Sequence, residues 1–251
     1  MSRVACTARL SAVAHKVLAC SNAQGSKTIS PWHDIPMKVT GKEGLVHFVC
    51  EIPKETKAKM EIALDEASNP VKQDTKKGKL RDYPYNINWN YGLIPQTWED
   101  PAHENAEAGG AGDNDPVDVV EIGSSQLEMG GVYQVKPIGC YAMIDEGELD
   151  WKVIAINSGD PLFDKINSVE DVETHIPGEL QRILEWFRDY KTPDGKPQNK
   201  FGYDNKCMST DFTWKVLSGS QHIFCLCPGQ LFSFLLLLSG EGEKCVCVCV
   251  C

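Results

Sequence analysis

The sequence predicts a mainly β domain with flanking helices, in the α+β class, and three observations lead to this prediction. Short runs rich in β-branched and aromatic residues are separated by Pro, Gly and Asn. One segment late in the chain has apolar residues at helical spacing instead. The chain has 251 residues, of which 42% are hydrophobic, so it can bury one sizeable core. We therefore expect one domain with unusual ends.

Four segments between residue 34 and about residue 205 are predicted strands. Each has period-two character and is bounded by turn-forming residues. In chain order they are LVHFVCEI (45–52), AKMEIAL (58–64), PVDVVEIG (116–123) and DWKVIAI (150–156). Because successive side chains of a strand point to opposite faces, such runs favour a curled sheet or a barrel.

Two helices are predicted in the second half of the chain. The longer one follows Pro177, with apolar residues at Leu180, Ile183, Leu184 and Phe187. A shorter helix is expected to begin at Ser168, whose hydroxyl fits a capping box with Asp171. The segment HENAEAGGAG (103–112) is predicted to be a flexible loop, serving either as a lid or as plain surface.

The two ends differ in composition from the rest. Residues 1–33 are basic and rich in Ala and Ser, so residues 1–27 are either a transit peptide or a disordered basic tail, followed by the domain at 28–208. Residues 209–251 form an atypical tail that includes LFSFLLLLS, too short to span a bilayer, and CVCVCVC. We interpret this tail as the result of a gene-model or splicing change, and a membrane-associated or metal-binding tail is the alternative. We expect residues 215–251 to be dispensable.

Charge and cysteine content exclude several classes of function. The formal net charge of −10 disfavours a non-specific nucleic-acid or anionic-membrane surface, since both attract an excess of Lys and Arg. Six of the eleven cysteines lie in the last 27 residues, and none has the usual spacing of a zinc site. We expect the five scattered cysteines to be reduced thiols.

Carboxylates carry the strongest chemical signal. Asp113, Asp115 and Asp118 lie in GDNDPVD, while Asp145 and Asp150 flank a turn. If these groups converge, their repulsion requires cations, and ligation by oxygen alone selects Mg²⁺ first, then Mn²⁺ or Ca²⁺. A calcium EF-hand does not fit the spacing, and a solvated acidic loop is the plain alternative.

Basic residues accompany these carboxylates. Lys152 follows Asp150 by two positions on a predicted strand, and Lys59 stands in the same relation to Glu61. Each pair taken alone is ordinary ion pairing. Arg81 and the dipeptide Tyr190-Lys191 are further candidates for binding phosphate. Together with them, the two pairs suit a polyanion bridged by metal ions.

Seven segments, in chain order from about residue 30 to 202, resemble the soluble family I inorganic pyrophosphatases, most closely the eukaryotic and plastid type. They are SPWHDIP, EIPKETKAKME, PVKQDTKKGKLR, NYGLIPQTWEDP, GDNDPVDVVEIG, MIDEGELDWKVIAI and EWFRDYKTPDGKP. The resemblance implies an OB-like five-stranded closed barrel with helices packed outside. It also implies an inorganic diphosphatase that hydrolyses pyrophosphate to two phosphates by attack of a metal-activated hydroxide.

The resemblance also implies roles for particular residues. Asp113, Asp118 and Asp150 would hold the first metal, Asp118 the second, Asp145 and Asp150 a third, and Glu61 a fourth. Asp115 would be the general base, and Glu51 would belong to the water network. Lys59, Arg81, Tyr91, Lys152, Tyr190 and Lys191 would bind phosphate, with Arg81, Tyr91 and Lys152 also catalytic. Three to four Mg²⁺ ions per site are implied, with Mn²⁺ as a substitute and Ca²⁺ as an inhibitor.

The sequence departs from the family pattern in three places. The segment between Arg81 and Tyr91 is shorter than in fungal members, so Ile87 falls at the register of a second tyrosine, with Tyr83 and Tyr85 close by. The usual N-terminal strand is not recognisable in residues 1–27, and the usual C-terminal helix is expected to be missing.

Two other classes compete with the enzyme. An OB-fold nucleic-acid-binding module would need a basic groove, which this charge distribution does not supply. A catalytically idle family member that acts through interactions is the second alternative. We expect pyrophosphate as the partner, no nucleic acid, no membrane, and a monomer or homodimer. The expected location is the plastid, with cytoplasm or mitochondrion as alternatives.

Overall fold

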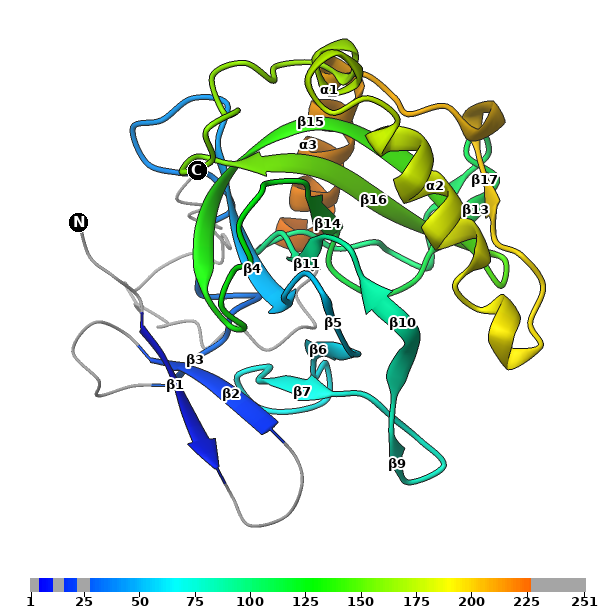
Figure 1. The fold of residues 1–251 in the computed structure, drawn as a ribbon. Coiled ribbons are helices and arrows are strands. Elements are labelled where there is room, and N and C mark those ends of the chain that lie inside the picture. Colours follow the sequence, from blue (N-terminus) through cyan, green and yellow to red (C-terminus); the bar gives the residue numbers. More distant parts are fainter. Residues whose placement is uncertain (1–4, 11–15, 22–27, 227–251) are drawn as a thin grey trace, which may run out of the picture.

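The computed structural model describes residues 5–10, 16–21 and 28–226 (Figure 1). The predictions for LFSFLLLLS and CVCVCVC fall on residues outside this part of the chain. The transit-peptide or tail interpretation of residues 1–27 and the domain limits 28–208 stay predictions.

Five strands form a closed ring, which confirms the mainly β prediction. Their order is β16, β14, β11, β4 and β15, and β15 pairs with β16 to close the ring. Neighbours are antiparallel except for the parallel pair β14 and β16. The strands are β4 (Val46–Ile52), β11 (Asn90–Leu93), β14 (Asp118–Glu121), β15 (Val132–Asp145) and β16 (Glu148–Asn157). Closure leaves no free edge within the ring.

The longest strand, β15, bends at Pro137 and Gly139. Its pairing with β16 shifts register between these residues, as expected for a bulge. A side chain at position 139 would collide with its surroundings, because a Cβ there would stand 2.6 Å from Val169 Cγ1 and 2.7 Å from the Met208 carbonyl oxygen. Glycine at this position therefore allows β15 to curve closely beneath the neighbouring segments.

Alternate side chains of the ring feed two hydrophobic clusters. Val120 and Ile154 pack with Phe187 of α2 (Glu179–Asp189), whereas Val119 and Val153 pack in a second cluster with Leu217 of α3 (Thr210–Leu226). The period-two pattern that predicts these strands therefore corresponds to two separate buried faces.

In the described part of the chain, three helices cover the ring: α1 (Val169–His175), α2 (Glu179–Asp189) and α3 (Thr210–Leu226). The first two were expected. The Ser168 hydroxyl accepts a hydrogen bond from the Asp171 backbone N–H at 3.2 Å and so caps α1. Short 3₁₀ turns, η1 (Thr192–Asp194) and η2 (Tyr203–Asn205), follow α2.

The prediction that the C-terminal helix is missing is wrong. Leu217 and Phe224 of α3 are buried, the Phe224 ring lies 5.8 Å from that of Trp32, and the Trp98 backbone N–H donates to the Ser220 carbonyl at 3.3 Å. A chain ending at residue 214 would lose these contacts. The segment misleads because its apolar residues run directly into the unusual terminal residues.

A second sheet contains strands from the N-terminal region. The strands β1 (Ala5–Leu10) and β2 (Lys16–Ser21) pair in antiparallel fashion, and β2 also pairs with β3 (Thr28–Ile29) and β7 (Val71–Gln73). Residues 1–27 thus include strands where the sequence shows no recognisable one. Within the described residues, no helix has the length and apolar character needed to cross a membrane.

The remaining strands are short and lie around the ring. They are β5 (Thr56–Ala58), β6 (Met60–Ile62), β8 (Thr75–Lys76), β9 (Lys79–Leu80), β10 (Asp82–Ile87), β12 (Glu104–Asn105), β13 (Gly110–Gly112) and β17 (Lys200–Phe201). The segment 103–112, predicted to be a flexible loop, includes β12 and β13, and β13 pairs with β16. That segment is therefore attached to the ring.

Candidate active site

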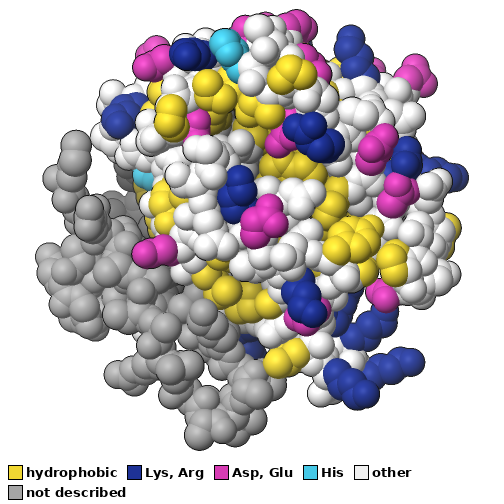
Figure 2. Space-filling model, viewed as in Figure 1, with side chains coloured by type: hydrophobic (Ala, Val, Ile, Leu, Met, Phe, Trp, Pro, Cys, Tyr) yellow, Lys and Arg dark blue, Asp and Glu magenta, His cyan; other side chains and the backbone are white. Residues whose placement is uncertain are grey.

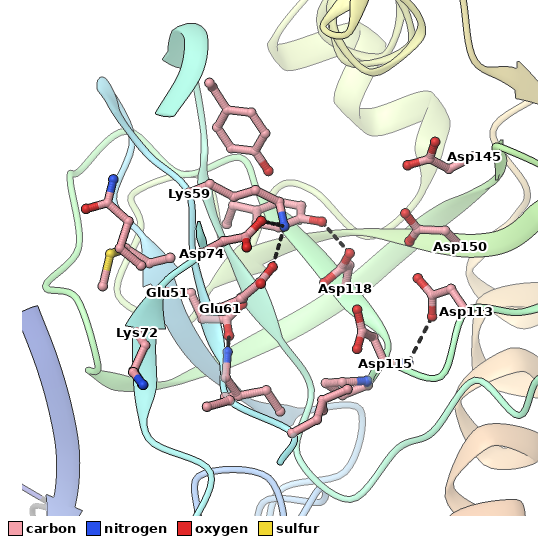
Figure 3. Close-up of a pocket in the computed structure, with 18 of the residues that line it drawn as sticks. Glu51, Lys59, Glu61, Lys72, Asp74, Asp113, Asp115, Asp118, Asp145 and Asp150 are labelled. Carbon is pink, nitrogen blue, oxygen red and sulfur yellow. Dashed lines mark hydrogen bonds and ion pairs between the residues drawn. The ribbon is translucent and has the colours of Figure 1, made fainter. Parts of the chain in front are cut away.

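A cavity of about 480 Å³ opens beside the ring and is lined mostly by charged side chains (Figure 3). Strands β6, β11, β14, β15 and β16, and helix α2, contribute to its wall. Eleven of the thirteen predicted site residues line it, and only Arg81 and Lys191 do not: the eleven are Glu51, Lys59, Glu61, Tyr91, Asp113, Asp115, Asp118, Asp145, Asp150, Lys152 and Tyr190.

 Arg81 contacts Asp74, and Lys191 contacts Asp145. Both aspartates line the cavity, so the structure brings the whole predicted set to one place.

Asp113 and Asp115 lie in the tight loop that precedes β14. The Asp115 backbone N–H donates to Asp113 Oδ1 at 3.0 Å, and Asn114 between them has a positive φ of 77°. Burial, with the nearby charges of Asp115 and Asp118, raises the pKa of Asp113 to about 7. Burial, with Asp118 and Glu61, raises the pKa of Asp115 to about 7 as well. The protein's own cations therefore do not neutralise the negative charge of Asp113 and Asp115.

Lys152 joins the two neighbouring strands at the floor of the cavity. The parallel register of β14 and β16 sets Asp118 opposite Lys152, and Asp150 lies two residues before Lys152 on the same face. Lys152 Nζ lies 2.5 Å from Asp118 Oδ2, 2.5 Å from Asp150 Oδ2 and 2.8 Å from Tyr91 Oη. Tyr91 Oη also donates to Asp118 Oδ2. Despite Lys152, burial raises the pKa of Asp150 well above its usual value.

The opposite wall carries a second group of charges, with Lys59 and Glu61 facing the aspartates across the cavity (Figure 3). Lys59 contacts Glu61, and its Nζ lies 3.4 Å from Asp74 Oδ2. Asp74 also contacts Arg81, so this aspartate holds two of the predicted phosphate-binding cations. Behind Glu61, the buried Glu51 accepts a hydrogen bond from the Ile62 backbone N–H at 2.7 Å.

A third group comes from the ends of β15 and α2. Tyr190 Oη donates to Asp145 Oδ2 at 3.4 Å, and Lys191 contacts the same carboxylate. The Tyr190 ring stacks on Trp186, with ring centroids 5.2 Å apart, which fixes its direction. Asp145 is thereby held at the rim of the cavity by the C-terminal end of α2, more than forty residues later in the sequence.

Sequence reasoning assigned no role to Asp74 and Glu99 in this region, and it placed Tyr83 only near the register of the second tyrosine. Tyr83 is 7% exposed and lines the cavity, whereas Ile87, at the register of the second tyrosine, is fully buried in the hydrophobic core. Glu99 contributes an oxygen to a group with Asp113 and Asp150 in which the three atoms lie within 4.8 Å of one another. Only the acidic character of QDTK and QTWED could have pointed to Asp74 and Glu99.

Basic side chains stand at the edge of this region. Lys76, Lys77 and Lys79 are exposed on the β8–β9 hairpin, and Lys and Arg side chains gather at the corresponding lower right of Figure 2. In a chain with a net charge of −10, such a hairpin creates a local positive field. An anion that approaches the cavity from this side is attracted before it reaches the carboxylates.

The arrangement as a whole suits a small anion that arrives with metal ions. Among the residues that the structure describes at this cavity, the metal-ligating side chains are carboxylates, which favour hard divalent cations. Lysine, arginine and tyrosine side chains supply donors for phosphate oxygens. Such a set of groups can stabilise the growing negative charge of a phosphoryl transfer.

Comparison with known proteins agrees with this chemistry. A model of the family described as inorganic pyrophosphatase matches residues 48–222. The chain is 64% identical over 201 residues to soluble inorganic pyrophosphatase 1, chloroplastic, of Chlamydomonas reinhardtii, covering 80% of this chain and 71% of that protein. It is 60% identical over 192 residues to soluble inorganic pyrophosphatase 6, chloroplastic, of Arabidopsis thaliana, covering 76% of this chain but only 63% of that protein.

Solved structures show the same relationship. The crystal structure of type I inorganic pyrophosphatase from Toxoplasma gondii matches with a TM-score of 0.84 and 43% identity, covering 88% of this chain and 97% of that one. An N-terminally truncated vacuolar soluble pyrophosphatase from Trypanosoma cruzi, solved in complex with PPi, matches with a TM-score of 0.83 and 37% identity, covering 89% and 90%. This chain therefore belongs to the inorganic pyrophosphatase family, whose members hydrolyse pyrophosphate to two phosphates.

Proposed function

We propose that this chain hydrolyses inorganic pyrophosphate in the cavity described above, by attack of a hydroxide formed with the help of Mg²⁺. The observation that carries the proposal is the convergence of Asp113, Asp115, Asp118 and Asp150 in one cavity of about 480 Å³. The buried lysine between two of them does not neutralise the group, since the pKa values of the other carboxyls stay raised. The site therefore requires further positive charge.

The chain's own residues fit Mg²⁺. Asp113, Asp118 and Asp150 would hold the first ion and Asp118 also the second, while Asp145 with Asp150, and Glu61, would hold those that accompany the substrate. When bound, divalent cations lower the pKa of an adjacent water so that hydroxide forms near neutral pH. Oxygen-only ligands support Mg²⁺ over softer ions, with Mn²⁺ as a substitute.

Asp115 is the proposed general base. Its backbone is fixed by the Asp113 carboxylate, yet no hydrogen bond or ion pair to its carboxylate is present among the described residues. A carboxylate that lines the cavity without a protein donor can accept a proton from water.

The cationic and phenolic residues are proposed to hold the two phosphates. Lys152 and Tyr91 stand at the floor, Lys59 and Arg81 at one wall, and Tyr190 with Lys191 at the rim. Each cation is already oriented by a carboxylate, so little rotamer freedom is lost when a phosphate arrives. Glu51, behind Glu61, is proposed to order water there.

The direct test is phosphate release by the full-length chain. With pyrophosphate and Mg²⁺ we expect turnover that disappears when the metal is removed. Asp118→Asn should abolish turnover because it removes a ligand of two ions, whereas the exposed Asp164→Asn is the matched control and should behave as the wild type. Metal-independent turnover, or full activity in Asp118→Asn, would contradict the proposal. A folded protein that binds Mg²⁺ but releases no phosphate would favour the idle family member.

Location and assembly belong to the same proposal. The two relatives compared above are named chloroplastic, and residues 1–33 are basic and lack acidic residues. We propose import into plastids, which a fluorescent protein fused after residue 33 tests by microscopy; a cytoplasmic or mitochondrial signal would contradict it. A monomer or homodimer is expected in sedimentation of the full-length protein.

A further inference from the structure

Glu99 is buried beneath two of the proposed metal-holding aspartates. Its side chain belongs to a residue that is 5% exposed, and it lies in the segment between β11 and β12. One carboxylate oxygen, Oε1, accepts a hydrogen bond from the Trp151 backbone N–H at 2.9 Å. Trp151 stands between Asp150 and Lys152 on β16, so Glu99 is fixed directly to the strand that carries Asp150.

The second oxygen of Glu99 has no hydrogen-bond partner in the described part of the chain. Oε2 is buried and forms no hydrogen bond to any described protein atom. One oxygen each from Glu99, Asp113 and Asp150 lie within 4.8 Å of one another. Lys152 contacts Asp150, but no ion pair joins it to Glu99. A buried carboxylate oxygen without a donor or cation is costly, so its retention calls for a ligand.

The backbone of Glu99 also holds the loop that bears the aspartates. Its N–H donates to the Asp115 carbonyl at 2.9 Å, and its carbonyl accepts from the Asn114 N–H at 2.9 Å. The two segments approach so closely that a Cβ at Gly112 would stand 2.3 Å from the Glu99 carbonyl carbon. The position of Glu99 relative to Asp113 is thus set by the fold and not by a flexible side chain.

We propose that Glu99 is a further ligand of the divalent cation held by Asp113 and Asp150, with Oε2 as the oxygen that contacts it. This assignment of Glu99 rests on the proposed function only because it concerns the same cation. Three carboxylates that share one space, one of them with a buried unpartnered oxygen, form an oxygen-only site for Mg²⁺ or Mn²⁺. The ion supplies the positive charge that Glu99 lacks among the described residues.

The test is metal binding by the full-length Glu99→Gln protein without substrate. Glutamine keeps an acceptor for the Trp151 N–H but removes the charge. Titration calorimetry with Mg²⁺, and the electron paramagnetic resonance signal of Mn²⁺, should show affinity for the tightest ion reduced by about 10- to 100-fold. Glu121→Gln is the matched control, because Glu121 is also buried but both of its oxygens accept hydrogen bonds. The metal affinity of this variant should stay unchanged.

Unfolding measurements separate this role from a purely structural one. Metal-free Glu99→Gln should be at least as stable as the wild type, because a buried charge next to Asp113 is removed, while the rise in Tm on adding Mg²⁺ should shrink. Unchanged metal affinity, or a metal-free variant that is markedly less stable or unfolded, would overturn the proposal. In the first case, hydrolysis by the wild type would still support the proposed function. A wild type that binds no divalent cation would overturn both.

Discussion

The metal-free protein should lose stability as the pH rises from 5 to 8. The pKa values of Asp113 and Asp115 are raised from 3.8 to about 7, so the folded state binds more protons than the unfolded state in this window. Stability therefore falls with increasing pH. One such carboxyl group accounts for a loss of about 3 kcal/mol between pH 5 and 8. Because the two groups repel each other, their combined loss should exceed this value but not reach twice it.

Urea unfolding of metal-free protein, followed by tryptophan fluorescence at several pH values, measures this dependence. Asp115→Asn should remove a large part of the decline, whereas Asp164→Asn, an exposed control, should not change it. Saturating Mg²⁺ should abolish the decline, since the cation replaces the protons between the carboxylates. A metal-free protein that is as stable at pH 8 as at pH 5, or more so, would refute the reasoning.

Three further predictions concern the ion, the C-terminal helix and one tyrosine. Ca²⁺ should bind but inhibit phosphate release, because a larger ion with looser coordination holds water in poorer attack geometry; equal turnover with both ions would contradict this. A chain ending at Leu226 should keep its turnover, whereas one ending at residue 214 should be unfolded in circular dichroism. The reason is that burial of Leu217 and Phe224 contributes about 3–6 kcal/mol to the free energy of unfolding. An active chain ending at residue 214 would refute this. Tyr83→Phe should raise KM by about 10-fold with little change in kcat, because Tyr83 lines the cavity and its hydroxyl has no hydrogen-bond partner among the described residues. An unchanged KM would exclude phosphate contact.

The strands and helices that the sequence predicted are those with a single clear periodicity. The segments 45–52, 116–123 and 150–156 became β4, β14 and β16 of the ring, and the segment after Pro177 became α2. Each combines hydrophobic spacing with clear turn residues at its ends. Local sequence was sufficient there.

The rest of the ring depends on tertiary contacts. The strand β15 was not singled out because Pro137 and Gly139 interrupt its pattern, yet the same residues bend it so that it pairs with both β4 and β16. The short β11 has Gly92 in its centre and is buried throughout, so it shows no alternation. Closure of a ring cannot be deduced from such segments one at a time.

In the candidate site, too, local sequence indicates some residues and tertiary contacts place the others. Asp113, Asp115 and Asp118 are close in sequence, and Asp150 with Lys152 share a strand face, so local patterns indicate them. Glu99 reaches the same place only because its backbone pairs with the loop at Asn114 and Asp115. A single glutamate between a tryptophan and an aspartate gives no sign of that pairing.

The most direct test of the account compares Asp115→Asn with Asp118→Asn in Mg²⁺ titrations and pH–rate profiles of phosphate release. Asp115→Asn should retain most of its metal affinity while kcat falls by about 10²- to 10⁴-fold, which is roughly 3–5 kcal/mol of barrier, and its optimum should move to higher pH where hydroxide forms unaided. Asp118→Asn should lose metal affinity itself. If Asp115→Asn loses metal as severely as Asp118→Asn, or keeps near-normal turnover, the assignment of the base is contradicted.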